Sequence, residues 1–354
     1  MQVQSILLAL LLTGSVFLVS QFENNQNENG QGNIRQDIYK IYQNWKQENG
    51  MIYQNSQEDY RFQVFKKNYE WIQQYNKEVG YEAVGLNHMA GLTKDEYIQT
   101  YLQKVEESQQ QNTIMNAFEE EDSLTGFQAD LPTSVDWVQE GAVTTVQDAG
   151  SCSASYAIAP VSAIASCYKL AGNKLIPLSA QQIISCDKNS AGCRGGSPIY
   201  SYLYAMQYGV MSNETYPYTS KNGNSGSCKY DDSEILYKPL NMYQIKSGSP
   251  DIMKKIVAQQ PITAKVDATD DSFRFYRGGE TPYHSNFCLT KGQDNISYSV
   301  LITGYNEEVE KPYWILQASF GTKWGNDGYM YLQNKSGYGY CGVNKYPSFP
   351  GMTK

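Results

Sequence analysis

The chain has 354 residues, of which 41% are hydrophobic, and a formal net charge of −8 at pH 7. This length has room for about two domains, and the apolar fraction is ordinary for a globular protein with a sizeable core. The acidic balance argues against a nucleic-acid-binding protein, which carries a basic patch or stripe. The chain has 30 Tyr and only 2 His, so it has few candidates for a general base.

An apolar run opens the chain. It is unbroken from Ile6 to Leu12, continues from Val16 to Val19, and gives way to a polar, Asn- and Gln-rich composition at Gln21. The run is shorter than the roughly 20 residues of a membrane-spanning helix, and we therefore predict a secretory signal peptide over 1–20. Because no Lys or Arg precedes the run, a short buried or membrane-anchoring helix remains the alternative. Residues 21 to about 36 have the composition of a disordered segment.

Two amphipathic helices are predicted next. In both, apolar side chains recur at the spacing of one helical face. In the first they are Ile38, Ile41, Tyr42 and Trp45, and in the second Phe62, Phe65, Tyr69 and Ile72. Asn49–Gly50 separates the two helices. The charged, Gln-rich stretch 103–127 is expected to be an exposed linker.

From Leu131 onward, cysteines, glycines and aromatic residues become dense. We predict helices over 156–170 and 200–208, with Pro160 either in the first turn or at a kink. Strands are predicted over 262–266, 300–305, 313–317 and 328–332. Helices followed by strands indicate an α+β protein with a helical half and a sheet half.

All seven cysteines lie in this second part: Cys152, Cys167, Cys186, Cys193, Cys228, Cys288 and Cys341. Together with a signal peptide they predict disulfide bonds, although six cysteines can pair in many ways. Three Asn-x-Ser/Thr sequons, at Asn213, Asn295 and Asn334, fit glycosylation on the secretory route.

Several motifs stand in a fixed order along the chain. Those of the first part are Arg61, Phe65, Asn68, Ile72 and Asn76, preceded by Gln57, and then Gly85–Leu86–Asn87 followed by Met89 and Gly91. Those of the second part are Leu131–Trp137, Gly141–Thr144, Leu178–Ser179 with Gln181, Cys186–Asp187 and Gly192–Gly196. Near the end come Gly304–Tyr305, Tyr313–Trp314 and Trp324–Tyr329.

In these motifs the chain, from about Ile38 to its C-terminus, resembles the papain family of cysteine proteases and most of all cathepsin L. The resemblance implies a papain-like fold of two subdomains, a helical half and a β-sheet or barrel half, preceded by a helical inhibitory propeptide. The expected domains are a signal peptide over 1–20, the propeptide and linker over 21–128, and the peptidase-like domain over 129–354. Where the family's propeptide has Glu, Phe and Asp, this chain has Gln57, Met89 and Gly91, and the family's control of processing is therefore not carried over.

The resemblance also implies a disulfide pairing of Cys152 with Cys193, Cys186 with Cys228, and Cys288 with Cys341. Cys167 is then left over. It stands about three turns along the helix from Ser155, and we expect it to be a buried apolar residue rather than a nucleophile.

The family reaction uses a Cys nucleophile, a His base, an Asn that orients the His, and a Gln that donates to the oxyanion. The flanking Gly150–Cys152 and Ala157 place Ser155 at the nucleophile position and Ala149 at the Gln position. Gln147 is two residues from the Gln position, and the backbone register argues against its replacing the missing donor.

The remaining positions of the reaction centre are replaced as well. Counting from Gly304 places Tyr298 at the His position, and Ala318 and Phe320 stand at the positions of the Asn and of the Trp that shields it. A phenol with a pKa near 10 does not take a proton from a Ser hydroxyl at neutral or acid pH. We therefore expect no catalytic role for these residues, and interpret Ser155 as a helix N-cap and the two rings as aromatic packing.

Neither His replaces the missing base in this interpretation. His88 lies in the propeptide. His284 stands four residues before Cys288, in a loop expected to be tied by its disulfide away from the cleft.

A binding cleft is expected to remain between the two halves. Gly195 and Gly196 match family glycines that bind the substrate backbone, and Pro198 matches a wall of the main specificity pocket. Lys265 replaces a small apolar pocket residue, and it either favours an acidic partner or fills the pocket. A glycan on Asn295 would stand three residues from Tyr298, at the edge of this cleft.

We therefore predict a secreted, catalytically inactive papain-like pseudoprotease that binds peptides, proteases or protease inhibitors, with its own propeptide as a further partner. Its expected location is extracellular or lysosomal/vacuolar, without a stable membrane anchor, and we expect no cofactor, metal or nucleic acid. The alternatives are an active endopeptidase with an unrecognised mechanism and a structural or storage secretory protein.

Overall fold

A computed structural model describes residues 36–102, 131–279, 281–285 and 297–351. The expected signal peptide, the polar stretch 21–35, the linker, Cys288 and Asn295 lie outside these residues. The chain divides into two compact units, Met1–Glu70 and Trp71–Lys354. Over the described ranges, no helix combines the length and the apolar character needed to cross a membrane.

The first unit contains a helix over 36–49 and the beginning of α2 (Asn55–Val79), as the two apolar stripes predicted. The stripes meet in an aromatic cluster, in which the Phe65 ring lies 5.2 Å from Tyr42 and 5.0 Å from Trp45. Gly50 ends the first helix with a φ of +63°, a backbone conformation that favours glycine. The ammonium group of Lys46 lies 2.5 Å from the Glu58 carboxylate and joins the two helices.

The second unit begins inside α2 and includes a short helix, α3 (Lys94–Tyr101), that the sequence did not predict. A capping box starts α3, because the Thr93 hydroxyl accepts from the Glu96 N–H while the Glu96 carboxylate accepts from the Thr93 N–H. These two bonds satisfy backbone donors that the first turn of a helix otherwise leaves unmade.

The helical half of this unit is built around α5 (Ser155–Leu170), which is buried along most of its length. Around it lie α6 (Ala180–Cys186), α7 (Pro198–Tyr208), the hairpin β2 (Val210–Met211) and β3 (Ile235–Tyr237), and the 3₁₀ turns Gly192–Arg194, Ser220–Asn222 and Asp232–Glu234.

Pro160 lies beyond the first turn of α5 and has no N–H to offer the Tyr156 carbonyl one turn before it. The Ser201 hydroxyl of α7 donates to that carbonyl over 2.8 Å instead. The helix therefore continues through the proline with its backbone acceptor satisfied.

The sheet half contains a seven-stranded antiparallel sheet in the order β4-β9-β5-β6-β7-β8, with β1 paired to β6. The strands are β1 (Ser134–Asp136), β4 (Met242–Gln244), β5 (Ile262–Val266), β6 (Tyr298–Asn306), β7 (Tyr313–Gln317), β8 (Tyr329–Gln333) and β9 (Ser348–Pro350). Short helices α8 (Pro250–Val257) and α9 (Asp271–Arg274) and the 3₁₀ turn Tyr340–Gly342 complete it. The predicted strands and the predicted α+β class are confirmed.

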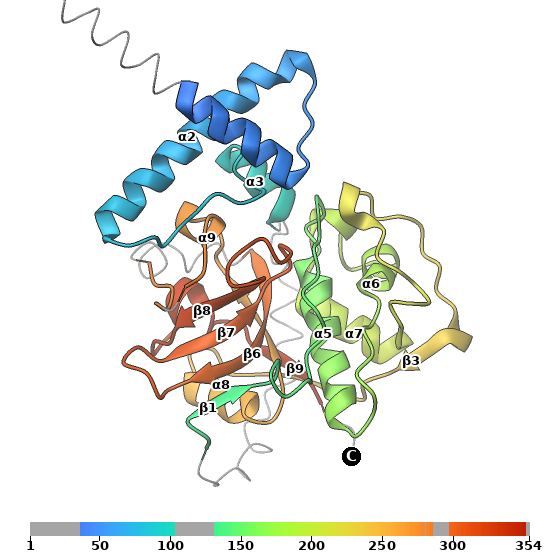
Figure 1. Cartoon of the computed structure of the whole chain (residues 1–354). Helices are drawn as coiled ribbons and strands as arrows, with labels where there is room; N and C mark the ends of the chain where they lie inside the picture. Colours follow the sequence, from blue (N-terminus) through green and yellow to red (C-terminus); the bar gives the residue numbers. More distant parts are fainter. Residues whose placement is uncertain (1–35, 103–130, 280, 286–296, 352–354) are drawn as a thin grey trace, which may run out of the picture. The chain divides into compact units, whose positions relative to one another are not determined.

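The two halves meet along α5 and β6, which lie side by side in Figure 1. Successive side chains of a strand point to opposite faces, so Leu301 joins the core of the helical half, whereas Val300 and Ile302 join the core of the sheet half. Strand β6 is buried almost throughout for this reason. It positions the residues of the candidate site against the N-terminus of α5.

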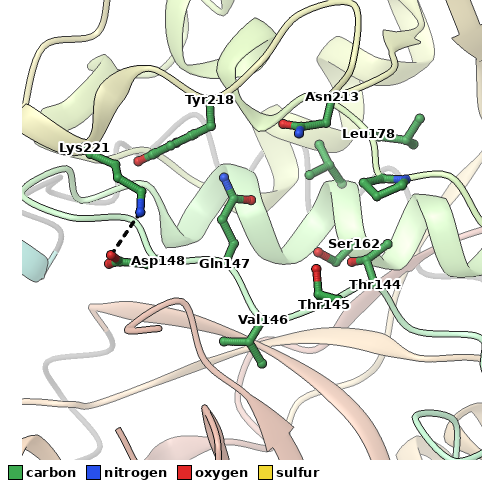
Figure 2. A pocket seen from close by; sticks show the side chains of 12 residues that line it. Thr144, Thr145, Val146, Gln147, Asp148, Ser162, Leu178, Asn213, Tyr218 and Lys221 are labelled. Atoms are coloured by element: carbon green, nitrogen blue, oxygen red, sulfur yellow. Dashed lines mark hydrogen bonds and ion pairs between the residues drawn. The ribbon is translucent and has the colours of Figure 1, made fainter. Parts of the chain in front are cut away.

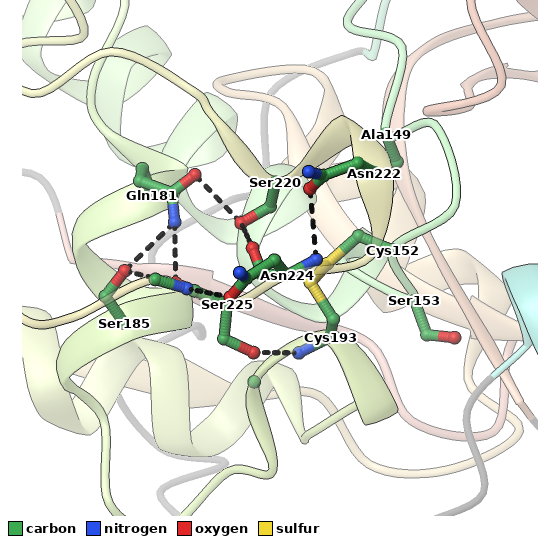
Figure 3. The surroundings of a disulfide bond; sticks show 12 residues. Ala149, Cys152, Ser153, Gln181, Ser185, Cys193, Ser220, Asn222, Asn224 and Ser225 are labelled. Atoms are coloured by element: carbon green, nitrogen blue, oxygen red, sulfur yellow. Dashed lines mark hydrogen bonds between the residues drawn. A yellow bond between two sulfur atoms is a disulfide. The ribbon is translucent and has the colours of Figure 1, made fainter.

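Two disulfides hold the helical half together. Cys152 pairs with Cys193 and Cys186 with Cys228, as the resemblance implied. Around the first, the Ser225 hydroxyl accepts from the Cys193 N–H, and the Gln181 amide donates to the Ser225 carbonyl (Figure 3). Cys341 is also disulfide-bonded, while its expected partner Cys288 lies outside the described residues.

Candidate functional site

Ser155 is the first residue of α5 and has only 1% of its surface exposed. Its hydroxyl oxygen accepts from the Ser299 N–H of β6 over 3.1 Å. The expectation that Ser155 caps α5 was wrong, because Ala154 holds the cap position and makes no side-chain cap bond. The Ser155 hydroxyl instead connects the helical half to the sheet half.

Tyr298 is the first residue of β6 and is 2% exposed. Its hydroxyl accepts from the Ser319 N–H over 2.9 Å and shares a second hydrogen bond of 2.9 Å with the Ser319 hydroxyl. Burial raises the pKa of the Tyr298 phenol well above its ordinary value of 10. The group therefore stays protonated at any physiological pH and cannot act as a base.

The remaining positions beside Tyr298 are apolar. The Phe320 ring stacks on the Tyr298 ring, with centroids 4.4 Å apart and an interplanar angle of 17°. The Trp324 and Phe320 rings pack in a T-shaped arrangement, with centroids 5.2 Å apart. Ala318 is buried next to this stack and has no side-chain hydrogen-bonding group. The geometry is that of a packed aromatic cluster.

On the other side of Ser155, the backbone around Ala149 is paired with the segment after β7. The Ala149 N–H donates to the Ser319 carbonyl over 2.9 Å, and Asp148 and Phe320 form an antiparallel bridge. The Ala149 carbonyl accepts from the Tyr218 hydroxyl over 2.8 Å. The Ala149 side chain is a buried methyl group, so it offers no donor to an oxyanion.

Gln147 lies in a separate pocket of ≈ 300 Å³ (Figure 2). Asn213, Tyr218 and an ion pair of 3.2 Å between Asp148 and Lys221 also line it. Neither Ser155 nor Tyr298 is among its lining residues, which agrees with the expectation from the backbone register.

The residues expected to line a binding cleft are Gly195, Gly196, Pro198 and Lys265. Gly195 has a φ of +112°, and a Cβ on Gly196 would stand 2.5 Å from the Tyr156 ring, so both positions require glycine. Pro198 is the buried first residue of α7. Lys265 is 93% buried, with its ammonium group 5.6 Å from the centre of the Tyr346 ring. Its side chain occupies space inside the domain rather than facing solvent.

Residues of α3, in the expected propeptide, pack against the aromatic cluster of Tyr298, Phe320 and Trp324. The edge of the Tyr101 ring meets Phe320 at 5.6 Å, and Tyr97 is fully buried beside it. The Ser153 hydroxyl is 3.1 Å from each of the carbonyls of Thr100 and Leu102. Sequence reasoning missed these contacts, although the four-residue spacing of Tyr97 and Tyr101 could have indicated a helical face.

The other candidates lie elsewhere. His284 contacts the Pro282 carbonyl, at 3.2 Å, and the Tyr340 ring. Cys167 is a buried thiol whose sulfur lies 3.5 Å from the Gly351 carbonyl. Asn213 and Asn334 are half-buried. The described ranges hold no group of three or more His, Cys, Asp or Glu side chains that could bind a metal ion.

Two sequence profiles match the chain. Residues 131–351 match the papain family cysteine proteases, and residues 42–97 match the cathepsin propeptide inhibitor domain (I29). The chain belongs to the papain family. Its domain architecture is that of a cysteine protease precursor, a papain-like domain preceded by a helical propeptide.

Relatives of the chain are plant proteases. Cysteine proteinase COT44 of Brassica napus is 31% identical over 323 residues, which cover 88% of this chain and 95% of the relative. Chymopapain of Carica papaya is 30% identical over 317 residues, which cover 88% of this chain and 86% of the relative.

Two of the similar solved structures are the following proforms. The proform of the ragweed pollen allergen Amb a 11, a cysteine protease, has a TM-score of 0.77 at 27% identity. The match covers 90% of this chain and 95% of the proform's chain. Digestive procathepsin L 3 of Tenebrio molitor larval midgut has a TM-score of 0.76 at 26% identity. The match covers 89% of this chain and 99% of the procathepsin chain. Both agree with the fold of a papain-like domain and its helical propeptide.

Proposed function

We propose that this papain-family protein is a secreted pseudoprotease that acts by binding and not by peptide hydrolysis. The observation that carries the proposal is that the groups at the reaction-centre positions are buried and hydrogen-bonded to other residues of the chain. The Ser155 hydroxyl accepts from the Ser299 N–H, and the Tyr298 hydroxyl bonds to Ser319. With both groups buried and engaged, we propose that neither faces a substrate carbonyl.

The chemistry supports the same proposal. A Ser nucleophile must lose its proton to a base in the transition state. Burial raises the pKa of the Tyr298 phenol, so the phenol is neutral and protonated over the working range of a peptidase. Loss of one oxyanion donor alone lowers the rate by about 10²–10³-fold in a serine protease, and the Ala149 side chain supplies no donor. Without nucleophile, base and oxyanion side chain, only binding and backbone effects remain.

The proposed partners are peptides, proteases or protease inhibitors. We propose that Gly195, Gly196 and Pro198, which match cleft residues of the family, contribute to a peptide-binding cleft; the φ of +112° at Gly195 and the close approach of Gly196 to the Tyr156 ring support this. We propose that Lys265, which is buried beside Tyr346, fills part of the pocket that a small apolar residue lines in the family. We propose a signal peptide over 1–20, a propeptide with linker over 21–128 and the papain-like domain over 129–354, in an extracellular or lysosomal/vacuolar location, with glycosylation at Asn213, Asn295 and Asn334.

A peptidase assay tests the loss of catalysis. The full chain, and the same chain cut within 103–130, are incubated with a broad peptide library between pH 4 and 8. We expect no turnover above that of Ser155→Ala. Turnover by the native chain that Ser155→Ala abolishes would sink the proposal.

A restored variant supplies the positive control. Ser155→Cys, Tyr298→His, Ala318→Asn and Ala149→Gln together rebuild the four side chains of the family reaction. We expect a thiol-directed active-site reagent to label this variant and not the native chain. Capture of a defined protease or inhibitor by the native chain would separate a binding role from storage.

A further inference from the structure

Residues 84–102, called the docked segment below, belong to the same compact unit as the papain-like domain. The segment begins as a strand-like pairing. Val84 and Tyr276 form an antiparallel bridge, and the Gly85 N–H donates to the Phe275 carbonyl over 2.9 Å. The Asn76 amide oxygen accepts from the Val84 N–H over 3.0 Å and fixes the approach from α2.

A buried cation holds the middle of the docked segment. The Arg274 side chain of α9 has no exposed surface, and its guanidinium donates over 2.6 Å to each of the carbonyls of Met89 and Leu92. The Arg274 carbonyl in turn accepts from the Asn87 amide over 2.8 Å. A guanidinium is costly to bury unless its donors are satisfied; the segment supplies two acceptors for Nη2, and the Asp271 carboxylate of α9 lies 3.5 Å from Nη1.

Aromatic packing holds the end of the segment. The fully buried Tyr97 donates to the Ala268 carbonyl over 2.9 Å, and the Tyr101 ring meets Phe320 edge-on. Met89 and Leu102 lie with these tyrosines in the core that also contains β5 to β8. The domain and the segment therefore share one hydrophobic core instead of meeting at a polar surface.

The surface beneath the segment is formed in part by the side chains that replace the reaction centre. Phe320 stacks on Tyr298 on one side and contacts Tyr101 on another. Departure of the segment would uncover the Phe320 ring, which also contacts Tyr298 and Trp324. A contiguous aromatic patch of this kind is unfavourable on the surface of a soluble protein.

We propose that the docked segment is a permanent structural part of the folded domain, and that residues 84–351 open and unfold as one cooperative unit. A propeptide that is released must undock while the domain beneath it stays folded. The proposal concerns stability and not hydrolysis, so it can fail while the proposed loss of catalysis stands, and the reverse also holds.

Native-state hydrogen exchange of the full chain tests the proposal. At pH 7 and at pH 5, with low concentrations of denaturant, we expect peptides from 84–102 and from β6 to show protection factors within about tenfold of each other. Their dependence on denaturant should be parallel. Exchange of 84–102 through a separate opening, while β6 stays protected, would overturn the proposal.

Two variants sharpen the measurement. Tyr101→Ala removes the ring on Phe320, and the milder Tyr97→Phe removes only the bond to the Ala268 carbonyl. In each we expect the protection of 84–102 and of β6 to fall by the same factor. Tyr338→Ala, at a tyrosine that is 47% exposed in the same unit, should change neither. A loss of protection confined to 84–102 contradicts the proposal.

Cutting the chain gives an independent readout. A specific protease site is inserted within 103–130, the purified chain is cut, and size-exclusion chromatography follows at pH 7 and at pH 5. We expect the N-terminal fragment to elute with the papain-like domain at both values. Separation of a folded domain from the fragment would show that the segment is removable, whether or not that domain hydrolyses peptides.

Discussion

The turn before α5 and the residues of the sheet half that face it lie close together, but they differ in how far they resemble the papain family. The turn keeps its family pattern: Gly150 at a φ of +62°, the Cys152–Cys193 disulfide, and a bond from the Ser153 N–H to the Cys193 carbonyl. The facing positions are those at which we propose that the family's catalytic side chains are replaced, with Tyr298 the clearest example. Under this proposal the covalent and backbone frame of the site persists without the side chains of the family reaction.

The reason lies in what each group contributes to stability. A Cβ at Gly150 would stand 2.3 Å from the Lys221 carbonyl, so the turn tolerates little change. Reactive side chains have no such constraint, because a site needs them for chemistry and not for folding. Their replacements, Ser155 and Tyr298, have acquired hydrogen bonds within the chain. These residues are part of the packed interior, which is the basis for the proposed loss of catalysis.

Removal of a disulfide tests the frame, and we expect the largest effect there. Cys152→Ala with Cys193→Ala removes a disulfide between residues 41 positions apart in the sequence. The chain-entropy relation gives a loss of about 4 kcal/mol in the free energy of unfolding. Denaturant unfolding of the full chain measures it. The matched control, Cys186→Ala with Cys228→Ala, spans 42 residues and should lose a similar amount. A negligible loss for the first pair alone would mean that the turn does not depend on its disulfide.

Tyr298→Phe tests the replaced positions with a smaller expected effect. The Phe ring keeps the stack on Phe320, but the Ser319 N–H and hydroxyl lose their buried partner. We expect a loss of about 2 kcal/mol, the typical cost of an unsatisfied buried polar group. Denaturant unfolding with Ser319→Ala in a double-mutant cycle assigns the loss to this pair. Equal stability of Tyr298→Phe and the native chain would contradict the role given to the hydroxyl.

Ser155→Ala should have a still smaller effect, about 1 kcal/mol, because the Ser299 N–H loses its acceptor. The same unfolding experiment measures it, with the exposed Ser247→Ala as the control. A structural serine predicts lower stability and no change in peptidase activity. A catalytic serine predicts the opposite pattern, in which activity is lost and stability is kept.

The smallest expected effect is a change in the pH dependence of stability, and His88 is the group that causes it. Burial lowers the pKa of its imidazole below the ordinary 6.5, while the nearby Asp148 acts in the opposite direction and Lys323 and Arg274 act in the same direction. The unfolded chain then binds a proton at a higher pH than the folded chain does. The stability that this group contributes is present above pH 6.5 and is lost as the pH falls through the lower, folded-state pKa.

We therefore expect the denaturant midpoint of the full chain to fall between pH 7 and pH 5.5, and to fall less in His88→Gln, whose side chain stays neutral. An equal fall in both chains would assign the pH dependence to other groups.

Prediction from the sequence succeeded where the signal is local. The helical stripes around Trp45 and Phe65 and the apolar run of β5 follow from periodicity and composition, and the structure confirms them. Strands of three residues, such as β1 and β9, were missed because they are too short to show a period. The capping role expected of Ser155 was wrong because the helix begins one residue earlier than that role requires.

The sequence by itself determined the family and the order of the elements, and it led to the proposal of which residues stand at the positions of the reaction. Motif spacing carries that information, since Ser155 is counted from Cys152 and Tyr298 from Gly304. Only the tertiary structure decided what those residues do now. The partner of Ser155 is 144 residues away, and Arg274 reaches a carbonyl 185 residues away. Such hydrogen bonds follow from how α5, β6 and the docked segment pack together, which no local pattern in the sequence specifies.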